Sequence, residues 1–183
     1  MHFLLALDYS VLNFFHTVAT QNGIFFFELV TFFGGVLGSL LVTVAALSYF
    51  YRYELEQYML PLVVAMVGNA TTIYILKYLI ARPRPLAALV LETGFSFPSG
   101  HAAAALLLYG FLTCIFLSGR DTEFRKGVCL ALVTLVVLAI GISRLYLGVH
   151  FLSDVVAGYL IGGLWLSLAL REQNFLLQEK FLP

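Results

Sequence analysis

The stretch SRLYLGVHFLSDVVAG, residues 143–158, decides how the rest of the chain is interpreted. Within twelve positions it places Ser143, Arg144, His150 and Asp154, although the sequence on both sides is strongly apolar. A charged side chain in the hydrocarbon core of a bilayer costs about 2.5–3.5 kcal/mol or more. We therefore expect these polar groups to serve a reaction or a ligand.

The composition is that of an integral membrane protein. Of the 183 residues, 61% are hydrophobic and 11% are charged, and the mean hydropathy is +0.96; a soluble domain is closer to half apolar and a quarter charged. The length indicates one domain, residues 1–183. The net charge is zero, so no basic surface indicates nucleic-acid binding. Cys114 and Cys129 lie in apolar runs and are expected to be small buried residues rather than disulfide or metal ligands.

The predicted fold is an all-α bundle of transmembrane helices. A spanning helix needs about 20 mainly apolar residues. Five segments qualify, with approximate bounds Ile24–Phe50, Tyr58–Lys77, His101–Leu117, Val128–Ser143 and Phe151–Leu170. The segment 78–100 is predicted to be a loop because its prolines and glycines break helices.

Residues 1–20 leave two alternatives open. One apolar stripe is interrupted by polar positions, Asp8 among them. This pattern suits an amphipathic helix in the membrane interface or a sixth span, and length does not separate the two.

Threading the predicted helices through a bilayer brings Lys77, loop 78–100, Arg144 and Asp154 to the same membrane face. The opposite face carries six cations: Arg52, Arg120, Arg125, Lys126, Arg171 and Lys180. Because cytoplasmic loops are enriched in lysine and arginine, we expect those six to be cytoplasmic. The polar clusters then face the periplasm or the extracellular side of the cell membrane.

Three polar clusters meet on that face: KYLIARPRP (residues 77–85), FPSGH (97–101) and the stretch that starts at Ser143. Arginine matches phosphate oxygens in a bidentate manner, and lysine adds a point charge. The N–H groups where Pro98-Ser99-Gly100 leads into a helix also favour an anion. The combination predicts a pocket for a phosphate group on an otherwise apolar substrate.

The same clusters contain groups suited to phosphoryl transfer. His150 and Asp154 are spaced i, i+4 and are expected to share one helix face. The carboxylate would fix the histidine tautomer and leave the other ring nitrogen free to attack. His101 would protonate the leaving oxygen, and the cations would stabilise the transition state. A phosphohistidine would form and then be hydrolysed, with no cluster of carboxylates to hold magnesium.

Simpler interpretations exist for each group. His150 and Asp154 can be a local helix contact, Lys77 and Arg84 can anchor helices at the headgroups, and Ser99 can be only a helix cap. His101, His150 and Asp154 could also bind zinc. A metal would leave the arginines unexplained, because cations repel it.

The three clusters resemble the signature of the type-2 phosphatidic acid phosphatase superfamily, K-x6-R-P, P-S-G-H and S-R-x5-H-x3-D. Every signature position is filled between residues 77 and 154. The resemblance implies that His150 is the nucleophile, Asp154 its partner and His101 the general acid. It also implies that phosphate is bound by Lys77, Arg84, Ser99, Gly100 and Arg144. It further implies a metal-independent reaction without a cofactor, and a membrane fold of six spans.

Three other polar residues are candidates for secondary roles. Glu28 lies near the site end of the first predicted span and either belongs to the site or reaches interfacial water. Arg82 lies one turn from Arg84 if the helix persists, and would meet a second phosphate or a headgroup. Ser143 opens the third motif and is a candidate for a supporting role.

Two pairs of glycines, Gly34 with Gly38 and Gly158 with Gly162, have the spacing of close helix packing. We expect them to pack within the monomer rather than to form a dimer.

The expected function is hydrolysis of a lipid phosphate or diphosphate at the outer leaflet of the cell membrane. By the resemblance, undecaprenyl diphosphate and phosphatidylglycerophosphate are the favoured substrates in a bacterium. A lipid-headgroup binding or transport protein that does not hydrolyse its ligand is the alternative. An ion channel is disfavoured because residues 130–142 are almost entirely apolar. The sequence assigns no oligomeric state.

Overall fold

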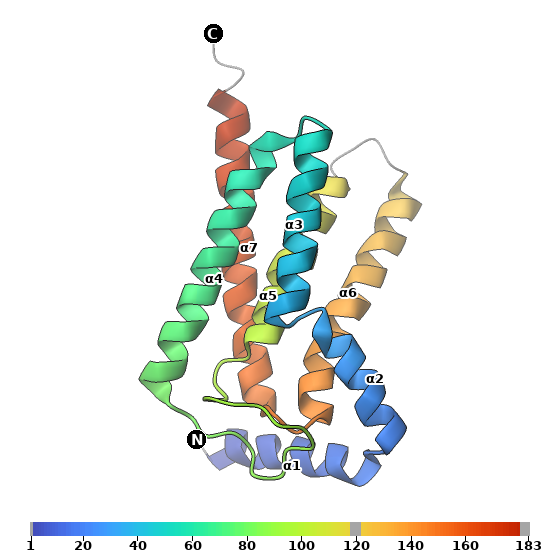
Figure 1. The fold of residues 1–183 in the computed structure, drawn as a ribbon, viewed down its shortest axis with the longest axis vertical. Coiled ribbons are helices and arrows are strands. Elements are labelled where there is room, and N and C mark those ends of the chain that lie inside the picture. Colours follow the sequence, from blue (N-terminus) through green and yellow to red (C-terminus); the bar gives the residue numbers. More distant parts are fainter. Residues whose placement is uncertain (1, 118–121, 180–183) are drawn as a thin grey trace.

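The computed structural model describes residues 2–117 and 122–179. Over these residues the secondary structure is helical throughout, which confirms the all-α prediction. The elements are α1 (His2–Val18), α2 (Gln21–Phe32), α3 (Val36–Arg52), the 3-10 turn η1 (Glu56–Tyr58), α4 (Met59–Ile80), α5 (Gly100–Phe116), α6 (Glu123–Tyr146) and α7 (Leu152–Glu179). Helices α3 to α7 run roughly along one axis, with α5 in the middle (Figure 1).

The prediction of five clear spans is not confirmed. Within the described residues, three helical stretches are long and apolar enough to cross a membrane: Glu56–Ile80, Glu123–Tyr146 and Leu152–Arg171. The predicted span 24–50 is instead two helices, α2 and α3, which bend by 41° and together could make a fourth span. Helix α5 falls short because it has 17 residues.

The break between α2 and α3 occurs where the backbone passes close to other helices. A Cβ atom on Gly34 would lie 2.5 Å from Ile140 Cγ2 and 3.2 Å from His101 O. A Cβ atom on Gly38 would lie 2.0 Å from the carbonyl oxygen of Phe32, at the end of α2. This first glycine pair therefore serves the bend and its contacts with α5 and α6.

The second glycine pair brings α5 and α7 into backbone contact. Cβ atoms on Gly158 and Gly162 would lie 2.4 Å from the carbonyl oxygens of Ser99 and Ala103, respectively. Only a residue without a side chain allows this approach. The prediction that this pair packs within the monomer is confirmed.

Helix α1 lies across the lower end of the bundle instead of along it (Figure 1). This placement matches the interfacial alternative for residues 1–20. Val11 and Phe15 pack against Leu145 and Val155, so part of the predicted stripe faces the bundle. Asp8, which interrupts that stripe, is turned inward and is 3% exposed.

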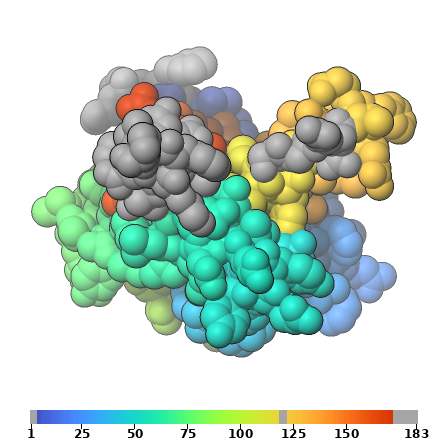
Figure 2. Space-filling view, turned by 90° about the horizontal axis from the view of Figure 1, so that it is seen from above, coloured from blue at the N-terminus to red at the C-terminus, as the bar shows by residue number. Residues whose placement is uncertain are grey.

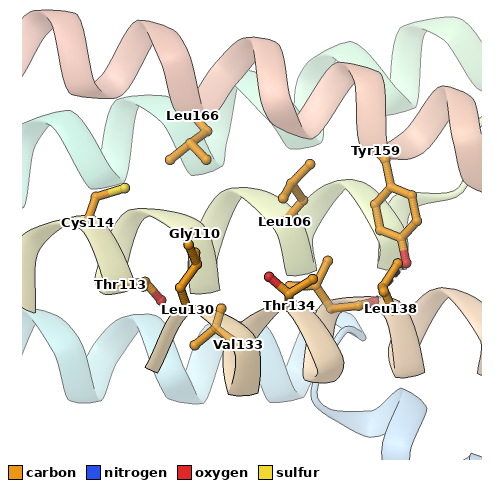
Figure 3. A pocket seen from close by; sticks show the side chains of 11 residues that line it. Leu106, Gly110, Thr113, Cys114, Leu130, Val133, Thr134, Leu138, Tyr159 and Leu166 are labelled. Carbon is orange, nitrogen blue, oxygen red and sulfur yellow. Dashed lines mark hydrogen bonds between the residues drawn. The ribbon is translucent and has the colours of Figure 1, made fainter. Parts of the chain in front are cut away.

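Helix α6 diverges from its neighbours toward the upper end, and its first turns stand at the edge of the bundle (Figure 2). Helices α5, α6 and α7 border an open apolar cavity of about 340 Å³, which Leu106, Val133 and Leu166 help to line (Figure 3). Cys114 also lines this cavity and is exposed, while Cys129 is partly exposed. The prediction that both cysteines are buried is wrong, because in a membrane protein an apolar side chain can face lipid.

Candidate active site

Segments far apart in the chain meet at the lower end of the bundle, beside α1. These are the ends of α4 and α6, loop 81–99, the start of α5 and the turn before α7 (Figure 1). All of these segments except α6 border a cavity of about 400 Å³ that also touches α3. Its polar lining includes Lys77, Arg84, Glu92, Thr93, His101 and His150. The predicted convergence of these clusters at one end is therefore observed.

His150 lies in the turn between α6 and α7 and not on a helix, contrary to the expectation that it shares a helix face with Asp154. Helix α6 ends at Tyr146, and Gly148 reverses the chain with φ +67°. A Cβ atom on Gly148 would also lie 3.2 Å from the carbonyl oxygen of Ala87. The turn therefore requires glycine.

The two ring nitrogens of His150 have different surroundings. Nδ1 lies 3.4 Å from Asp154 Oδ2, and Nε2 lies 3.3 Å from Arg84 Nη1. Because a guanidinium group only donates, the nitrogen facing Arg84 carries the lone pair and Nδ1 carries the proton. Burial lowers the pKa of His150 to about 4, although the neighbouring carboxylate of Asp154 acts in the opposite direction. His150 is therefore neutral at pH 7.

Asp154 is fully buried and makes contacts on several sides. Its Oδ2 accepts a hydrogen bond from Phe151 N at 2.9 Å, as an acidic residue in the first turn does in a capping box. Its Oδ1 accepts one from Arg82 Nη1 at 2.6 Å, and the Arg82 guanidinium lies 4.1 Å from the centre of the Phe151 ring. These contacts hold the carboxylate in place beside His150.

Arg84 is tied to the backbone around the site. It donates hydrogen bonds to the carbonyl oxygens of Thr93, Gly94 and Val149, at 3.0, 3.1 and 3.0 Å. Lys77, near the end of α4, donates to the carbonyl oxygen of Phe95. Both cations thus connect loop 81–99 to the cavity.

Arg144 is almost fully buried near the end of α6. Its Nη1 donates to Thr31 Oγ1 at 2.8 Å, and its Nη2 lies 3.1 Å from Glu92 Oε2. Its Nε is buried and has no hydrogen-bond partner within the described part of the chain. This guanidinium therefore keeps a donor available for an anion.

Ser99 and Gly100 start α5 as predicted, and Ser99 is the N-cap residue. The Ser99 hydroxyl is buried, makes no capping hydrogen bond and has no partner among residues 2–117 and 122–179. The alternative that Ser99 serves only as a helix cap is therefore not supported, because the side chain does not make the capping hydrogen bond. His101 follows on α5 and lines the same cavity as His150. Burial, together with the nearby charges of Arg144, His150 and Arg84, lowers the pKa of His101 well below 6.5.

The three residues predicted to have secondary roles do not line the cavity. Glu28 is exposed on α2 and makes no ion pair with any residue that the structure describes. The Ser143 hydroxyl donates to Ile140 O at 2.6 Å, within its own helix. Arg82 is not one helical turn from Arg84, because α4 ends at Ile80 and the next residue, Ala81, has φ 49°. Arg82 binds two carboxylates, those of Asp8 and Asp154.

Sequence reasoning missed two acidic residues, Asp8 and Glu92. Asp8 accepts hydrogen bonds from Ser153 N at 2.9 Å, from Ser153 Oγ at 2.6 Å and from Arg82 Nη2 at 2.8 Å. Glu92 lies 3.7 Å from Arg84 and 3.1 Å from Arg144. The available signal was weak: Asp8 is a charge in an apolar helix, and Glu92 is the single acid of loop 78–100.

The zinc alternative lacks a ligand set. No three histidine, cysteine, aspartate or glutamate side chains within residues 2–117 and 122–179 converge to hold a metal ion. Arg82 and Arg84 instead border the His150–Asp154 pair.

A model of the PAP2 superfamily matches residues 58–176. The chain therefore belongs to the PAP2 superfamily, and its relatives place it in the membrane lipid phosphatase branch.

The two curated relatives described here are both named as phosphatases. The chain is 36% identical over 126 residues to phosphatidylglycerophosphatase B of Bacillus subtilis, across 67% of this chain and 61% of the relative. It is 41% identical over 70 residues to lipid A 4'-phosphatase of Bacteroides thetaiotaomicron, across 38% of this chain and 28% of the relative. The chain thus spans less than two thirds of the length of these relatives.

Two solved structures share the fold. The transmembrane PAP2-type phosphatidylglycerolphosphate phosphatase from Bacillus subtilis matches with a TM-score of 0.85 and 25% identity, over all of this chain and 89% of that one. Aquifex aeolicus LpxE matches with a TM-score of 0.71 and 25% identity, over 90% of this chain and 95% of that one.

Proposed function

We propose that the chain is a metal-independent phosphatase that hydrolyses a lipid phosphate or diphosphate through a phosphohistidine. The observation that carries the proposal is the position of His150, between a carboxylate at 3.4 Å and a guanidinium at 3.3 Å, on the wall of a cavity shared with His101. A carboxylate, a histidine and cations in this order are an oriented nucleophile beside an anion site. The names of the relatives support the same activity.

In the first step, His150 Nε2 attacks phosphorus and the bond from phosphorus to the leaving oxygen breaks. Asp154 stabilises the positive charge that develops on the ring, since it faces Nδ1. Arg84, Arg144 and Lys77 stabilise the negative charge on the phosphoryl oxygens. The N–H groups at the start of α5 add to this stabilisation.

The negative charge of the bound phosphate favours the protonated form of His101. His101 then donates this proton to the leaving oxygen, so the lipid alcohol or the lipid monophosphate departs without a negative charge on that atom. In the second step the neutral His101 takes a proton from water, and the water oxygen attacks phosphorus. The bond between nitrogen and phosphorus breaks, orthophosphate is released and both histidines return to their starting states.

A lipid substrate fits the surroundings of the cavity. Away from the charged side chains, further into the bundle, the cavity lining is largely apolar and comes from α3, α4 and α5. Val36 is 87% exposed and Tyr74 62% exposed, although both line the cavity, so it opens sideways between α3 and α4. A lipid can thus present its phosphate while its chains stay in the bilayer. The Bacillus subtilis relatives favour phosphatidylglycerophosphate as substrate, with undecaprenyl diphosphate the other candidate.

The proposed orientation places this site on the outer face of the cell membrane. Arg52 ends α3, while Arg125 and Lys126 lie in the first turn of α6, at the end of the bundle away from the site. Arg120 and Lys180 lie outside the described residues. In the sequence, six cations are expected at that end and four at the site end, and this difference supports a cytoplasmic position for the end away from the site.

The decisive experiment is release of orthophosphate from a panel of lipid phosphates and diphosphates by protein in detergent. His150→Ala should abolish release, whereas Glu28→Ala, which removes an exposed carboxylate, should leave it unchanged. EDTA should leave the rate unchanged, and acid quenching with labelled substrate should trap an acid-labile phosphoprotein.

Two results would contradict the proposal. If His150→Ala releases phosphate at the wild-type rate, His150 is not the nucleophile. If the wild type binds these lipids tightly but releases no phosphate, the chain is a lipid-binding protein instead.

A further inference from the structure

An apolar run lies at the tip of loop 81–99 and has no function in the mechanism above. Residues 86–91 read LAALVL, and none of them is buried although the segment is neither helix nor strand. Leu86 and Leu91 have relative exposures of 105% and 102%, and no other large hydrophobic side chain whose exposure the structure describes exceeds 87%. A run of exposed apolar residues is unfavourable in water unless it serves a contact. We therefore looked for the surface that this run meets.

The run belongs to a constrained loop. Ser96 N donates a hydrogen bond to Arg82 O at 2.9 Å, which ties the two sides of the loop together. Arg84 adds its hydrogen bonds to the opposite side of the loop. At the tip, Leu89 N donates to Leu147 O at 3.0 Å, so the tip rests on the turn between α6 and α7. The two exposed leucines flank this contact and are held facing outward by it.

Helix α1 indicates the level of the loop tip relative to the membrane. A Cβ atom on Gly148 would lie 3.2 Å from Ala87 O and 3.3 Å from His16 Nε2, so the tip and α1 meet at the same turn. Helix α1 lies across the end of the bundle and exposes apolar side chains, Leu4 and Phe14 among them (Figure 1). A helix of this kind lies in the plane of the membrane interface. The loop tip is therefore at the level of the interface.

The lipid-facing surface of α4 continues onto the loop. Helix α4 belongs to one of the long apolar spans, and its last residues, Tyr78, Leu79 and Ile80, are exposed. The ring of Tyr78 packs edge to face against the ring of Phe95, with the ring centres 5.6 Å apart. Aromatic side chains are enriched at the boundary between membrane and water. The loop thus leaves and rejoins the bundle at that boundary, where lipid is within reach of its tip.

The charges beside the run face away from it. Residues 85–91 contain no ionisable side chain. The nearest charged residues, Arg84 and Glu92, both line the cavity, and their side chains lie 3.7 Å apart. The outward side of the tip is therefore apolar and uncharged, which suits the region between headgroups and acyl chains.

We propose that Leu86 and Leu91 insert into the headgroup region of the leaflet on the site's side, so that the tip of loop 81–99 is an interaction surface for the bilayer. The same loop carries Arg84, Glu92 and Thr93 to the cavity. Insertion of the tip keeps the lipid surface level with these residues. The membrane contact is independent of the proposed function, whereas its effect on turnover rests on that function.

Fluorescence of Leu91→Trp in phosphatidylcholine nanodiscs tests the contact directly. The wild type, whose single tryptophan is Trp165, supplies the background. We expect the added emission to be quenched by lipids brominated on the acyl chains, more strongly when the bromine atoms are shallow, and little by iodide in the water. Quenching by iodide alone would place the tip in water, and quenching by neither would place it against protein. Either result refutes the insertion.

Kinetics test what the insertion does. Leu86→Ser combined with Leu91→Ser keeps the hydrogen bonds of the loop and removes its apolar contact. A long-chain phosphatidic acid in nanodiscs must then move further out of the leaflet to reach Arg84. Its KM should rise about three- to tenfold, because full burial of one leucine is worth a factor of about ten or more and the spans still hold the chain in the bilayer.

Two controls isolate the membrane contact. The KM for dibutanoyl phosphatidic acid, which dissolves in water, should stay at the wild-type value in the double serine variant. Leu60→Ser removes an exposed leucine from the first turn of α4, at the other end of the bundle, and should leave both KM values unchanged. An unchanged KM for the long-chain lipid in the double variant would refute the role of the insertion in turnover. If the wild type releases phosphate from neither substrate, the proposed function fails, and the fluorescence result still decides the insertion.

Discussion

Asp8 provides the sharpest test of how the site is assembled, because it joins α1 to the His150–Asp154 pair through few contacts. Its carboxylate accepts two hydrogen bonds from Ser153 and one from Arg82. Ser153 N belongs to the first turn of α7, where four N–H groups need partners outside the helix. Arg82 in turn donates to Asp154. Asp8 therefore caps α7 and anchors the guanidinium that holds the partner of His150.

Removing this carboxylate should cost stability and rate together. Breaking a buried ion pair costs about 3–5 kcal/mol, and we take the lower end for Asp8→Ala because Arg82 keeps Asp154 as a partner. A loss of about 3 kcal/mol corresponds to a melting temperature about 6–12 °C lower for a chain of this size. The value of kcat should fall while KM stays close to wild type, since Asp8 reaches the reaction only through Arg82 and Asp154.

The assay is a thermal ramp in detergent followed by the fluorescence of Trp165, the single tryptophan of the chain. Orthophosphate release by the same samples gives kcat and KM. Asp8→Asn keeps the size of the side chain and removes its charge, so it should show a smaller loss of stability. Glu28→Ala is the control for loss of a carboxylate. A melting temperature and a kcat both equal to wild type in Asp8→Ala would refute the role of Asp8.

Three further predictions concern other parts of the structure. Glu92→Gln should lower KM, because the carboxylate of Glu92 neutralises the two arginines that the substrate phosphate must reach. The change should be only about two- to fivefold, since partly exposed ion pairs are weak. Gly162→Val should cost about 1–3 kcal/mol of stability, since its side chain would overlap the backbone of α5, whereas Gly127→Val on α6 meets no atom within 4 Å and should be tolerated. The pKa of His150 is lowered from 6.5 to about 4 in the folded state, so the unfolded chain binds the extra proton between these values. Stability should therefore fall as the pH is lowered from 6.5 to 4, and His150→Gln should lack this contribution.

Each of these predictions has a clear contrary result. A higher KM in Glu92→Gln would mean that Glu92 orients the arginines for the substrate. Equal melting temperatures for Gly162→Val and Gly127→Val would contradict the close backbone contact of α5 with α7. Parallel curves of melting temperature against pH for the wild type and His150→Gln would show that the pKa of His150 is the same in the folded and unfolded states.

The convergence of the site was predictable because membrane topology constrains which helix ends can meet. Lys77, Arg84, Arg144 and His150 each lie at or beyond the end of an apolar segment, so alternation of the spans brings them to one face. The expected contact between His150 and Asp154 is present, but His150 lies in a turn and not on the same helix as Asp154. Spacing alone could not show that Gly148 would end α6 before His150.

The features that were missed depend on contacts distant in sequence. The pairing of Asp8 with Ser153 spans 145 residues, and it exists only because α1 lies across the end of the bundle. The break in the first predicted span is set by the approach of Ile140 and His101 to Gly34, which a hydropathy pattern does not report. The new direction of Arg82 follows from the left-handed backbone at Ala81 and from Pro83, which prevents the helix from continuing.

The ion pairs of Glu92 bear on how turnover would end. When orthophosphate leaves, a site built only from cations would be left without counter-charges and would hold its product strongly. Here the loop carries its own acid within 3.1 Å of Arg144 and 3.7 Å of Arg84. That acid can replace the departing anion, so product escape becomes an exchange of one counter-charge for another, and the vacated pocket is already neutralised when the next lipid arrives.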